Sequence, residues 1–280
     1  MNGFLAPAKL NLFLNITSQR ADGYHCLQTI FQFLDYCDIL HFNKRSDGNL
    51  ISHYSHAENF PPEQDLVLRA AHLLKQYSGT LLGANIQVDK KIPLGGGLGG
   101  GSSDAATTLL ALNKIWQLDL SSVILSKLGL KLGADVPVFV QGHAAWAEGI
   151  GEILTPIDLD EPWYLVLDPA CQVSTATIFN ARDLTRDSLS VIMGDYFADR
   201  TQNVCESVVR RLYPQVGEAL DWLSQYSPAR MTGTGACLFA RFANLASANT
   251  VLAELPGQWR GFVAQGKNIS PALSQFRKTL

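Results

Sequence analysis

The sequence lacks the features that mark several classes of protein. Its five cysteines are odd in number and form no CxxC pair, which argues against a disulfide framework or a cysteine zinc site. No apolar run reaches the 18 or so residues that span a bilayer. The first residues also lack the charged segment and apolar stretch of a signal peptide. We therefore expect a cytoplasmic protein with no membrane partner.

Strong charge of either sign is also missing. The chain has 22 basic and 25 acidic residues and a net charge of -3, too little positive charge to gather nucleic acid. Its 280 residues are 47% hydrophobic and 17% charged, as in an ordinary globular protein with a sizeable core. This length allows one or two domains. No linker marks a boundary, and we place the change of domain near 150–160.

Two hydrophobic periodicities share the chain. Apolar residues alternate over 5–16, which predicts a strand with Lys9 and Asn11 on one face. Helical spacing over 65–77 predicts a helix that Asp65 could cap. We predict further strands over 28–34, 37–43, 50–54, 84–90, 138–141, 144–148, 163–168, 229–232, 237–242 and 260–265, and further helices over 102–116, 121–132, 175–181, 203–213, 215–225 and 245–254. The fold class is α+β.

The most informative stretch is the glycine run 95–101, where six of the seven residues are glycine. Glycine lets a backbone approach a ligand closely, and the free N–H groups of the helix that follows favour an anion. This pattern predicts a loop that cradles a triphosphate. Ser102 and Ser103 could cap the helix, donate to a phosphate or bind the water shell of a magnesium ion. The alternative is a tight loop with no ligand, in which no packing gain would offset the conformational entropy that six glycines lose on folding.

Two other glycine patterns carry little weight. Gly95, Gly97 and Gly100 match a dinucleotide fingerprint as letters, but no clear βαβ unit surrounds them. Residues 261–268 nearly spell a P-loop, yet Asn268 replaces the required Ser or Thr and only twelve residues follow it. We interpret this second stretch as an edge strand and a turn.

Three motifs together resemble a known superfamily. Residues 93–103, PLGGGLGGGSS, resemble the phosphate-binding motif of the galactokinase–homoserine kinase–mevalonate kinase–phosphomevalonate kinase superfamily. Its other two motifs are similar to PAKLNL at 7–12 and MTGTGAC at 231–237. Finer features resemble the diphosphocytidyl-methylerythritol kinases within that superfamily, and these are KLNLFL at 9–14, RADGYH at 20–25, GADVPVF at 133–139 and AEGIGE at 147–152.

The resemblance implies an ATP-dependent kinase with two domains and its active site in the cleft between them. Residues 1–155 would form the N-terminal ATP-binding domain and residues 156–280 the C-terminal, substrate-side domain. The implied reaction phosphorylates the 2-hydroxyl of the methylerythritol part of a cytidine diphosphate substrate, in the non-mevalonate isoprenoid pathway. One position departs from the family pattern, since Val204 stands where many relatives have an acidic residue. Thr232 and Asp104 stand where Ser and Asn are also common.

The resemblance also implies roles for the polar residues. Asp135 would be the general base and Lys9 its cationic partner, because phosphoryl transfer needs a group to accept a proton and a charge to stabilise the transferred phosphoryl. Asn11 would bind the substrate. Without the other motifs, Asp135 would be interpreted as a turn aspartate between a helix and the strand 138–141, and Lys9 as a solvated strand lysine.

Tyr24 and His25 resemble a cytidine site, with an aromatic face to stack on the base and an imidazole to bind its edge. Phe179 could form the opposite wall, or it could be a core phenylalanine. His25 lacks neighbours at the spacing of metal ligands. For ATP, the implied residues are Pro93, Leu94, Gly95, Gly96, Gly97, Leu98, Gly99, Gly100, Gly101, Ser102, Ser103, Thr234 and Gly235, with Asp65 and Leu66 near the adenine.

The implied cofactors are ATP and Mg²⁺, with Ser103 as the candidate metal ligand. The implied partner is the small cytidine diphosphate substrate, with no nucleic acid; both a monomer and an oligomer stay open. Two alternatives remain beside this hypothesis. One is a different kinase of the same superfamily, such as a homoserine kinase. The other is a non-catalytic nucleotide-binding module that has kept the fold.

Overall fold

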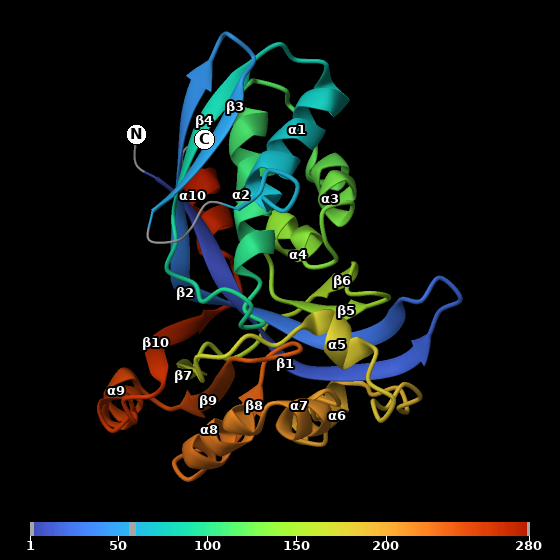
Figure 1. The fold of residues 1–280 in the computed structure, drawn as a ribbon, viewed down its shortest axis with the longest axis vertical. Helices are drawn as coiled ribbons and strands as arrows, with labels where there is room; N and C mark the ends of the chain where they lie inside the picture. Colours follow the sequence, from blue (N-terminus) through green and yellow to red (C-terminus); the bar gives the residue numbers. More distant parts are fainter. Residues whose placement is uncertain (1–2, 56–59, 279–280) are drawn as a thin grey trace.

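Two long antiparallel strands, β1 (Phe4–Gln19) and β2 (His25–Arg45), run through the centre of the molecule. The structure is a computed structural model that describes residues 3–55 and 60–278. The strands pair from Phe4 and Leu40 to Gln19 and His25, and join through a turn at Gly23, whose φ of 89° suits glycine. They extend from the upper half of the molecule into the lower half (Figure 1). The segments predicted at 28–34 and 37–43 are therefore one strand.

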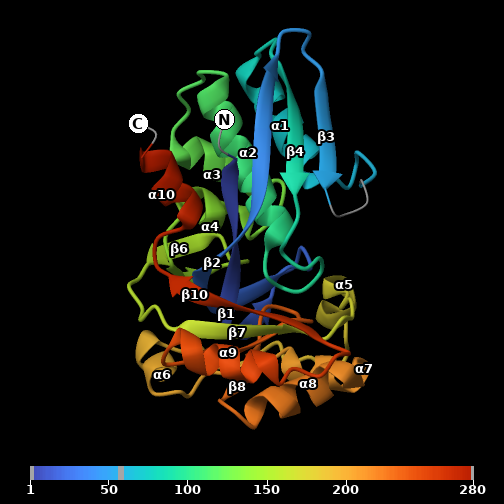
Figure 2. The same ribbon diagram turned by 90° about the vertical axis from the view of Figure 1, so that its left-hand side faces the viewer.

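A continuous mixed sheet connects the two halves. Its order is β3 (Leu50–Ser55), β4 (Gly83–Asp89), β2, β10 (Arg260–Lys267), β7 (Trp163–Asp168), β9 (Leu238–Phe242) and β8 (Ala229–Met231), with β5 (Ala145–Glu148) and β6 (Ile153–Pro156) attached through β2. Only the pair β3 and β4 is parallel among the described strands. Strand β10 pairs with both β2 and β7 and links the halves (Figure 2). The stretch 261–268, which nearly spells a P-loop, therefore belongs mostly to an interior strand, and its prediction as an edge strand is wrong.

Helices cover one side of the upper sheet (Figure 1). These are α1 (Leu66–Ser78), α2 (Gly100–Ile115), α3 (Ser122–Leu130) and α4 (Val136–Gln141), and α10 (Pro271–Lys278) packs on β1. Asp65 caps α1 as predicted, because its carboxylate accepts the N–H groups of Val67 and Leu68 at 2.8 and 3.1 Å. The buried residues of the upper core lie between Ala6 and Ala147, and Phe4, Leu154 and Phe276 pack against them.

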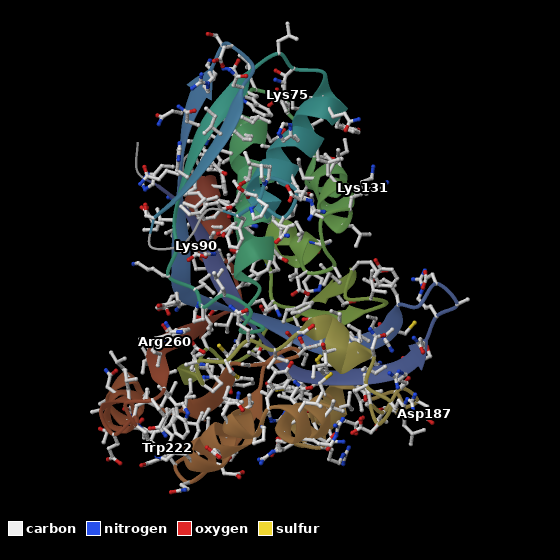
Figure 3. All side chains as sticks on the ribbon, in the orientation of Figure 1. Lys75, Lys90, Lys131, Asp187, Trp222 and Arg260 are labelled. Atoms are coloured by element: carbon white, nitrogen blue, oxygen red, sulfur yellow. The ribbon has the colours of Figure 1, made fainter. Side chains whose placement is uncertain are left out.

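The lower half has a core of its own. Its helices are α5 (Thr175–Phe179), α6 (Met193–Phe197), α7 (Glu206–Leu212), α8 (Pro214–Ser224) and α9 (Leu245–Ala253). Leu14 and Ile16 of β1 join this core, together with Val204, which explains why an apolar residue is tolerated there. Figure 3 labels Trp222 and Arg260 in this half and Lys75 and Lys131 in the upper half. The boundary at residue 155 stays a prediction.

The strand predicted at 138–141 is wrong, because these residues belong to helix α4. Val136 to Val140 are all buried, so the run has no polar face that would distinguish a helix from a strand. Pro137 lies in the first turn of the helix, where its missing N–H costs nothing. The sequence reading also missed β6, α6 and α10. None of the helices within the described ranges is long and apolar enough to cross a bilayer.

Candidate active site

A cavity of about 730 Å³ lies where the glycine loop, β1, β2, α5 and the turn at 233–234 meet. It brings together most of the residues predicted for the site. Those lining it are Lys9, Asn11, Tyr24, His25, Leu66, every residue from Pro93 to Ser102, Asp135, Phe179 and Thr234. Ala134, Ile150, Thr175, Asn180 and Gly233 also line it and were not predicted. Asp65, Ser103 and Gly235 do not line the cavity.

The glycine loop needs its glycines for two physical reasons. Gly95, Gly97 and Gly99 have φ values of 69°, 75° and 72°, in the left-handed region. A Cβ at Gly97 would also lie 2.3 Å from the carbonyl oxygen of Thr232. The Thr232 hydroxyl donates to the Gly97 carbonyl at 3.3 Å, and the N–H of Cys237 donates to the Gly96 carbonyl at 3.1 Å. The second glycine turn, which contains Gly233 and Gly235, and its flanking residues Thr232 and Cys237 therefore hold the loop in place.

The loop ends at the start of α2, as the sequence predicts, but the serines do not cap the helix. Helix α2 begins at Gly100, and its N-cap Gly99 supplies no side chain. Its first N–H groups are therefore directed toward the cavity end of the helix, where an anion is favoured. Ser102 lines the cavity. Ser103 is fully buried, and its hydroxyl has no hydrogen-bond partner among the described residues.

Ser103 therefore lies behind the cavity wall, and its role as a metal ligand stays a prediction. Its neighbour Asp104 is also buried and is paired with Lys90 at 2.7 Å. In the described part of the chain, no group of three or more His, Cys, Asp or Glu side chains is arranged to hold a metal ion.

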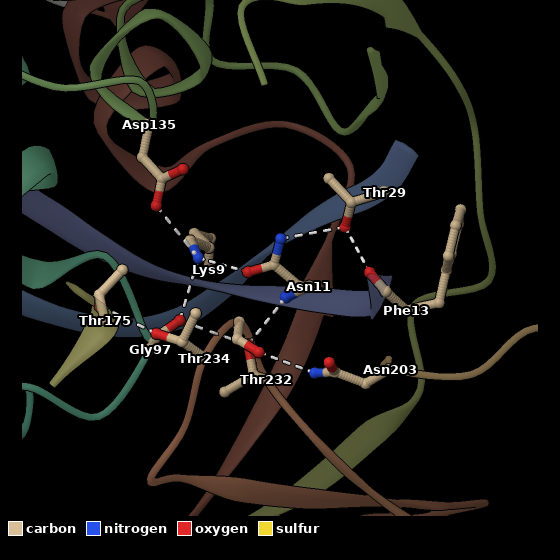
Figure 4. Close-up of polar contacts among 11 residues, drawn as sticks. Lys9, Asn11, Phe13, Thr29, Gly97, Asp135, Thr175, Asn203, Thr232 and Thr234 are labelled. Atoms are coloured by element: carbon tan, nitrogen blue, oxygen red, sulfur yellow. Dashed lines mark hydrogen bonds and ion pairs between the residues drawn. The ribbon is translucent and has the colours of Figure 1, made fainter. Parts of the chain in front are cut away.

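Lys9 and Asp135 both line the cavity and contact each other (Figure 4). The Lys9 Nζ is 3.2 Å from a carboxylate oxygen of Asp135, 2.5 Å from Asn11 Oδ1 and 3.0 Å from the Gly97 carbonyl. The Phe31 ring lies 5.4 Å from the same nitrogen. Lys9 is 2% exposed, which excludes a solvated strand lysine. The arrangement joins a cation removed from water to a carboxylate that lines the cavity.

Asn11 is held by two hydroxyl groups. Its backbone N–H donates to Thr232 Oγ1 at 2.9 Å, and its side-chain amide donates to Thr29 Oγ1 at 3.0 Å (Figure 4). Asn203 holds the backbone on both sides of Thr232, since its amide donates to the carbonyls of Met231 and Gly233 at 2.9 and 2.7 Å. Sequence reasoning gave Asn203 no role, because no local pattern connects it with the turn it supports.

Aromatic rings gather at one end of the cavity, and their contacts with a cytosine stay a prediction. The rings of His25 and Phe179 are stacked on each other, with centroids 5.0 Å apart and an interplanar angle of 18°. Tyr24 is 59% exposed at the rim. Phe179 is half-buried, lines the cavity and also packs against the lower core.

Arg186 contacts the cavity residue His25 and was not predicted from the sequence. Its Nε donates to His25 Nε2 at 3.1 Å. Burial and the charge of Arg186 both lower the pKa of His25. A single arginine in an irregular segment carries no signal in the sequence, and only the folded chain places it behind the imidazole.

Comparison with known proteins assigns the chain to a family. Residues 65–143 match the family described as GHMP kinases N terminal domain, and residues 186–261 match GHMP kinases C terminal. A 4-diphosphocytidyl-2-C-methyl-D-erythritol kinase of Nitrosococcus oceani is 56% identical over 274 residues, which are 98% of each chain. The chain belongs to this kinase family. A relative with the same name from Tolumonas auensis is 53% identical, over 95% of this chain and 93% of its own.

Solved structures agree with this family. A crystal structure of 4-(cytidine 5'-diphospho)-2C-methyl-D-erythritol kinase has a TM-score of 0.81 and 31% identity, over 94% of this chain and 98% of its own. A mevalonate kinase shares the fold alone, with a TM-score of 0.70 and 16% identity over 96% and 99% of the two chains. The predicted superfamily, the α+β kinase fold and the kinase family are therefore confirmed.

Proposed function

We propose that the chain transfers the γ-phosphoryl group of ATP to the 2-hydroxyl of 4-diphosphocytidyl-2-C-methyl-D-erythritol, in the non-mevalonate isoprenoid precursor pathway. The observation that carries the proposal is the pair of Lys9 and Asp135, which share one cavity with the glycine loop. The high identity to named kinases of this substrate supports the choice of acceptor.

Asp135 accepts the proton of the attacking hydroxyl, because its carboxylate lines the cavity. Lys9 lies close enough to stabilise both the developing alkoxide and the transferred phosphoryl group. Positioning supplies most of the catalysis in phosphoryl transfer, and the contacts that hold Lys9 and Asn11 provide it.

The glycine loop and the N-terminus of α2 bind the phosphates of ATP, and the hydroxyl-bearing residues Ser102 and Thr234 line the same cavity. A Mg²⁺ ion bound to the ATP would neutralise part of the phosphate charge. Asn11, Tyr24, His25 and Phe179 bind the acceptor. We further propose that residues 1–155 form the ATP-binding domain and 156–280 the substrate-side domain.

The same proposal places the enzyme in the cytoplasm, with small molecules as its partners and neither nucleic acid nor membrane among them. The net charge of -3 supports this, since a surface without excess positive charge has little attraction for phosphate backbones or anionic lipids.

The decisive experiment incubates the protein with Mg–ATP and 4-diphosphocytidyl-2-C-methyl-D-erythritol while ADP and the phosphorylated product are measured. We expect ADP that depends on the substrate and disappears in Asp135→Ala. ADP with homoserine, mevalonate or a sugar instead would overturn the acceptor and keep the superfamily. ATP binding without any turnover would support the non-catalytic module.

A further inference from the structure

Arg186 lies behind His25 and is fixed there by the backbone. Its guanidinium donates to the carbonyl oxygens of Phe179, Ala181 and Leu184 at 2.7, 2.8 and 3.0 Å. Its Nε donates to His25 Nε2 at 3.1 Å. Three backbone carbonyls therefore fix the position of the guanidinium, and this position places its Nε against the imidazole of His25.

The chemistry of the two side chains then fixes the proton on the imidazole. A guanidinium keeps all its protons in a protein and can only donate. His25 Nε2 must accept this hydrogen bond with its lone pair, and the proton of the neutral ring must be on Nδ1. A second proton on Nε2 would face the N–H of Arg186, so the charged ring is disfavoured. The lowered pKa of His25, caused by burial and by Arg186, agrees with this.

The Nδ1–H group remains available to a ligand. Nδ1 makes no hydrogen bond to any other residue of the described ranges, and His25 lines the cavity. Phe179 stacks on the ring and Arg186 holds its far edge, so the ring cannot rotate freely to present Nε2. The cavity therefore offers a bound base one donor with a fixed direction.

We propose that Arg186 is a positioning residue that holds His25 as an Nδ1–H donor and thereby makes the cavity select cytosine over uracil. This rests on the proposed cytidine substrate. Cytosine has acceptors at N3 and O2, whereas uracil carries a proton on N3. A fixed donor pairs with cytosine N3 and opposes the N–H of uracil. The opposite tautomer, with an acceptor at Nδ1, would remove this preference.

The first test needs no substrate. Nitrogen-15 chemical shifts of the histidine rings are measured in the ligand-free full chain, in Arg186→Met and in Arg182→Met, a control at an exposed arginine four residues earlier. We expect His25 as the Nδ1–H tautomer in the wild type and in Arg182→Met, and a mixture of tautomers in Arg186→Met. An Nε2–H tautomer in the wild type, or an unchanged tautomer in Arg186→Met, would overturn the proposal.

The second test measures base selection through competition by CDP and UDP against the substrate. CDP should bind about tenfold or more tightly than UDP in the wild type, the size expected of one well-placed pair of base contacts. In Arg186→Met this ratio should approach one and KM should rise, with kcat changed much less. In a His25→Phe background, Arg186→Met should leave the ratio unaltered, because Arg186 acts through His25.

A purely structural role for Arg186 would weaken CDP and UDP equally, and that result would contradict the proposal. If neither nucleotide competes in the wild type, the cytidine substrate and the base selection both fail. The tautomer measurement would then still decide whether Arg186 holds the imidazole, so the two failures are distinguishable.

Discussion

The Lys9 ammonium lies 3.2 Å from the Asp135 carboxylate, and the two side chains differ sharply in their exposure to water, at 3% and 34%. The lysine is enclosed by Asn11, Gly97 and the Phe31 ring, while the carboxylate reaches the cavity. An ion pair that served stability alone would have no need to keep its carboxylate accessible. This asymmetry suits a base that must meet a substrate hydroxyl.

We expect Asp135→Asn to lower kcat by about 10²–10⁴-fold, the usual contribution of a general base. The amide keeps the shape of the side chain but cannot take a proton, so ATP binding should change little. Steady-state kinetics and nucleotide titration check both parts. Asp119→Asn, at an exposed position, is the matched control and should retain activity. Equal kcat in the two variants would rule out Asp135 as the base.

Lys9→Met should also lower kcat strongly, because it removes the buried cation beside the base. Lys9 and Asp135 act as one unit, so the double variant Lys9→Met/Asp135→Asn should lose little more activity than the worse single variant. The kcat values of the two single variants and the double variant, each relative to the wild type, give the coupling energy between the two side chains. Losses that multiply would mean that the two side chains act independently.

Gly97→Ala should destabilise the protein more than Gly95→Ala, by about 2 kcal/mol. Both glycines have a φ near 70°, so the backbone strain of alanine is similar at the two positions. At Gly95 the nearest atom to a Cβ is 3.9 Å away, whereas at Gly97 the Thr232 carbonyl is 2.3 Å away. Denaturant unfolding of both variants measures the difference. Equal losses would show that the loop can move off the second glycine turn at no cost.

Thr232→Val should cost about 2 kcal/mol of stability, because it leaves the buried N–H of Asn11 without its acceptor. It should also lower kcat, since Asn11 touches Lys9. Thr232→Ser keeps the hydroxyl and is the matched control, with kcat close to the wild type. The hydroxyl would have no role in positioning if the valine variant kept full turnover.

Asp104 should make stability depend on pH. It is buried with Asp38 around the ammonium of Lys90, so two carboxylates share one cation. Burial first, and Asp38 in addition, raise the pKa of Asp104 from 3.8 to about 7, against the opposing effect of Lys90. A group whose pKa is raised by folding binds more protons in the folded state, so stability should fall as pH rises from about 4 to about 7.

Asp104→Asn should flatten this dependence and raise the free energy of unfolding at pH 8, by on the order of 1 kcal/mol, because the amide stays neutral. Asp38→Asn is the contrasting variant. Asp38 accepts the N–H groups of Lys91 and Ile92 at 2.5 and 2.9 Å, so its loss should destabilise. Unfolding curves at pH 5 and pH 8 test both. A parallel pH dependence in the wild type and Asp104→Asn would refute the role of Asp104.

Local patterns predicted most of the secondary structure. Alternation placed β1 and its Lys9 and Asn11, and the spacing of apolar residues with Asp65 as a cap placed α1. The prediction was wrong where every residue is buried, as in 136–140, because burial on all sides removes the periodicity. It also divided β2, where the chain reaches from one half of the molecule to the other as a single strand.

The sequence by itself determined the glycine loop, the helix behind it and the residue types of the phosphoryl-transfer site, because these follow from short-range chemistry at fixed spacing. Only the tertiary structure decided that Ser103 is buried, that His25 stacks on Phe179, and that Arg186 fixes the imidazole. Such contacts join segments far apart in the chain, and their energies arise only when the sheet that links both halves brings those segments together.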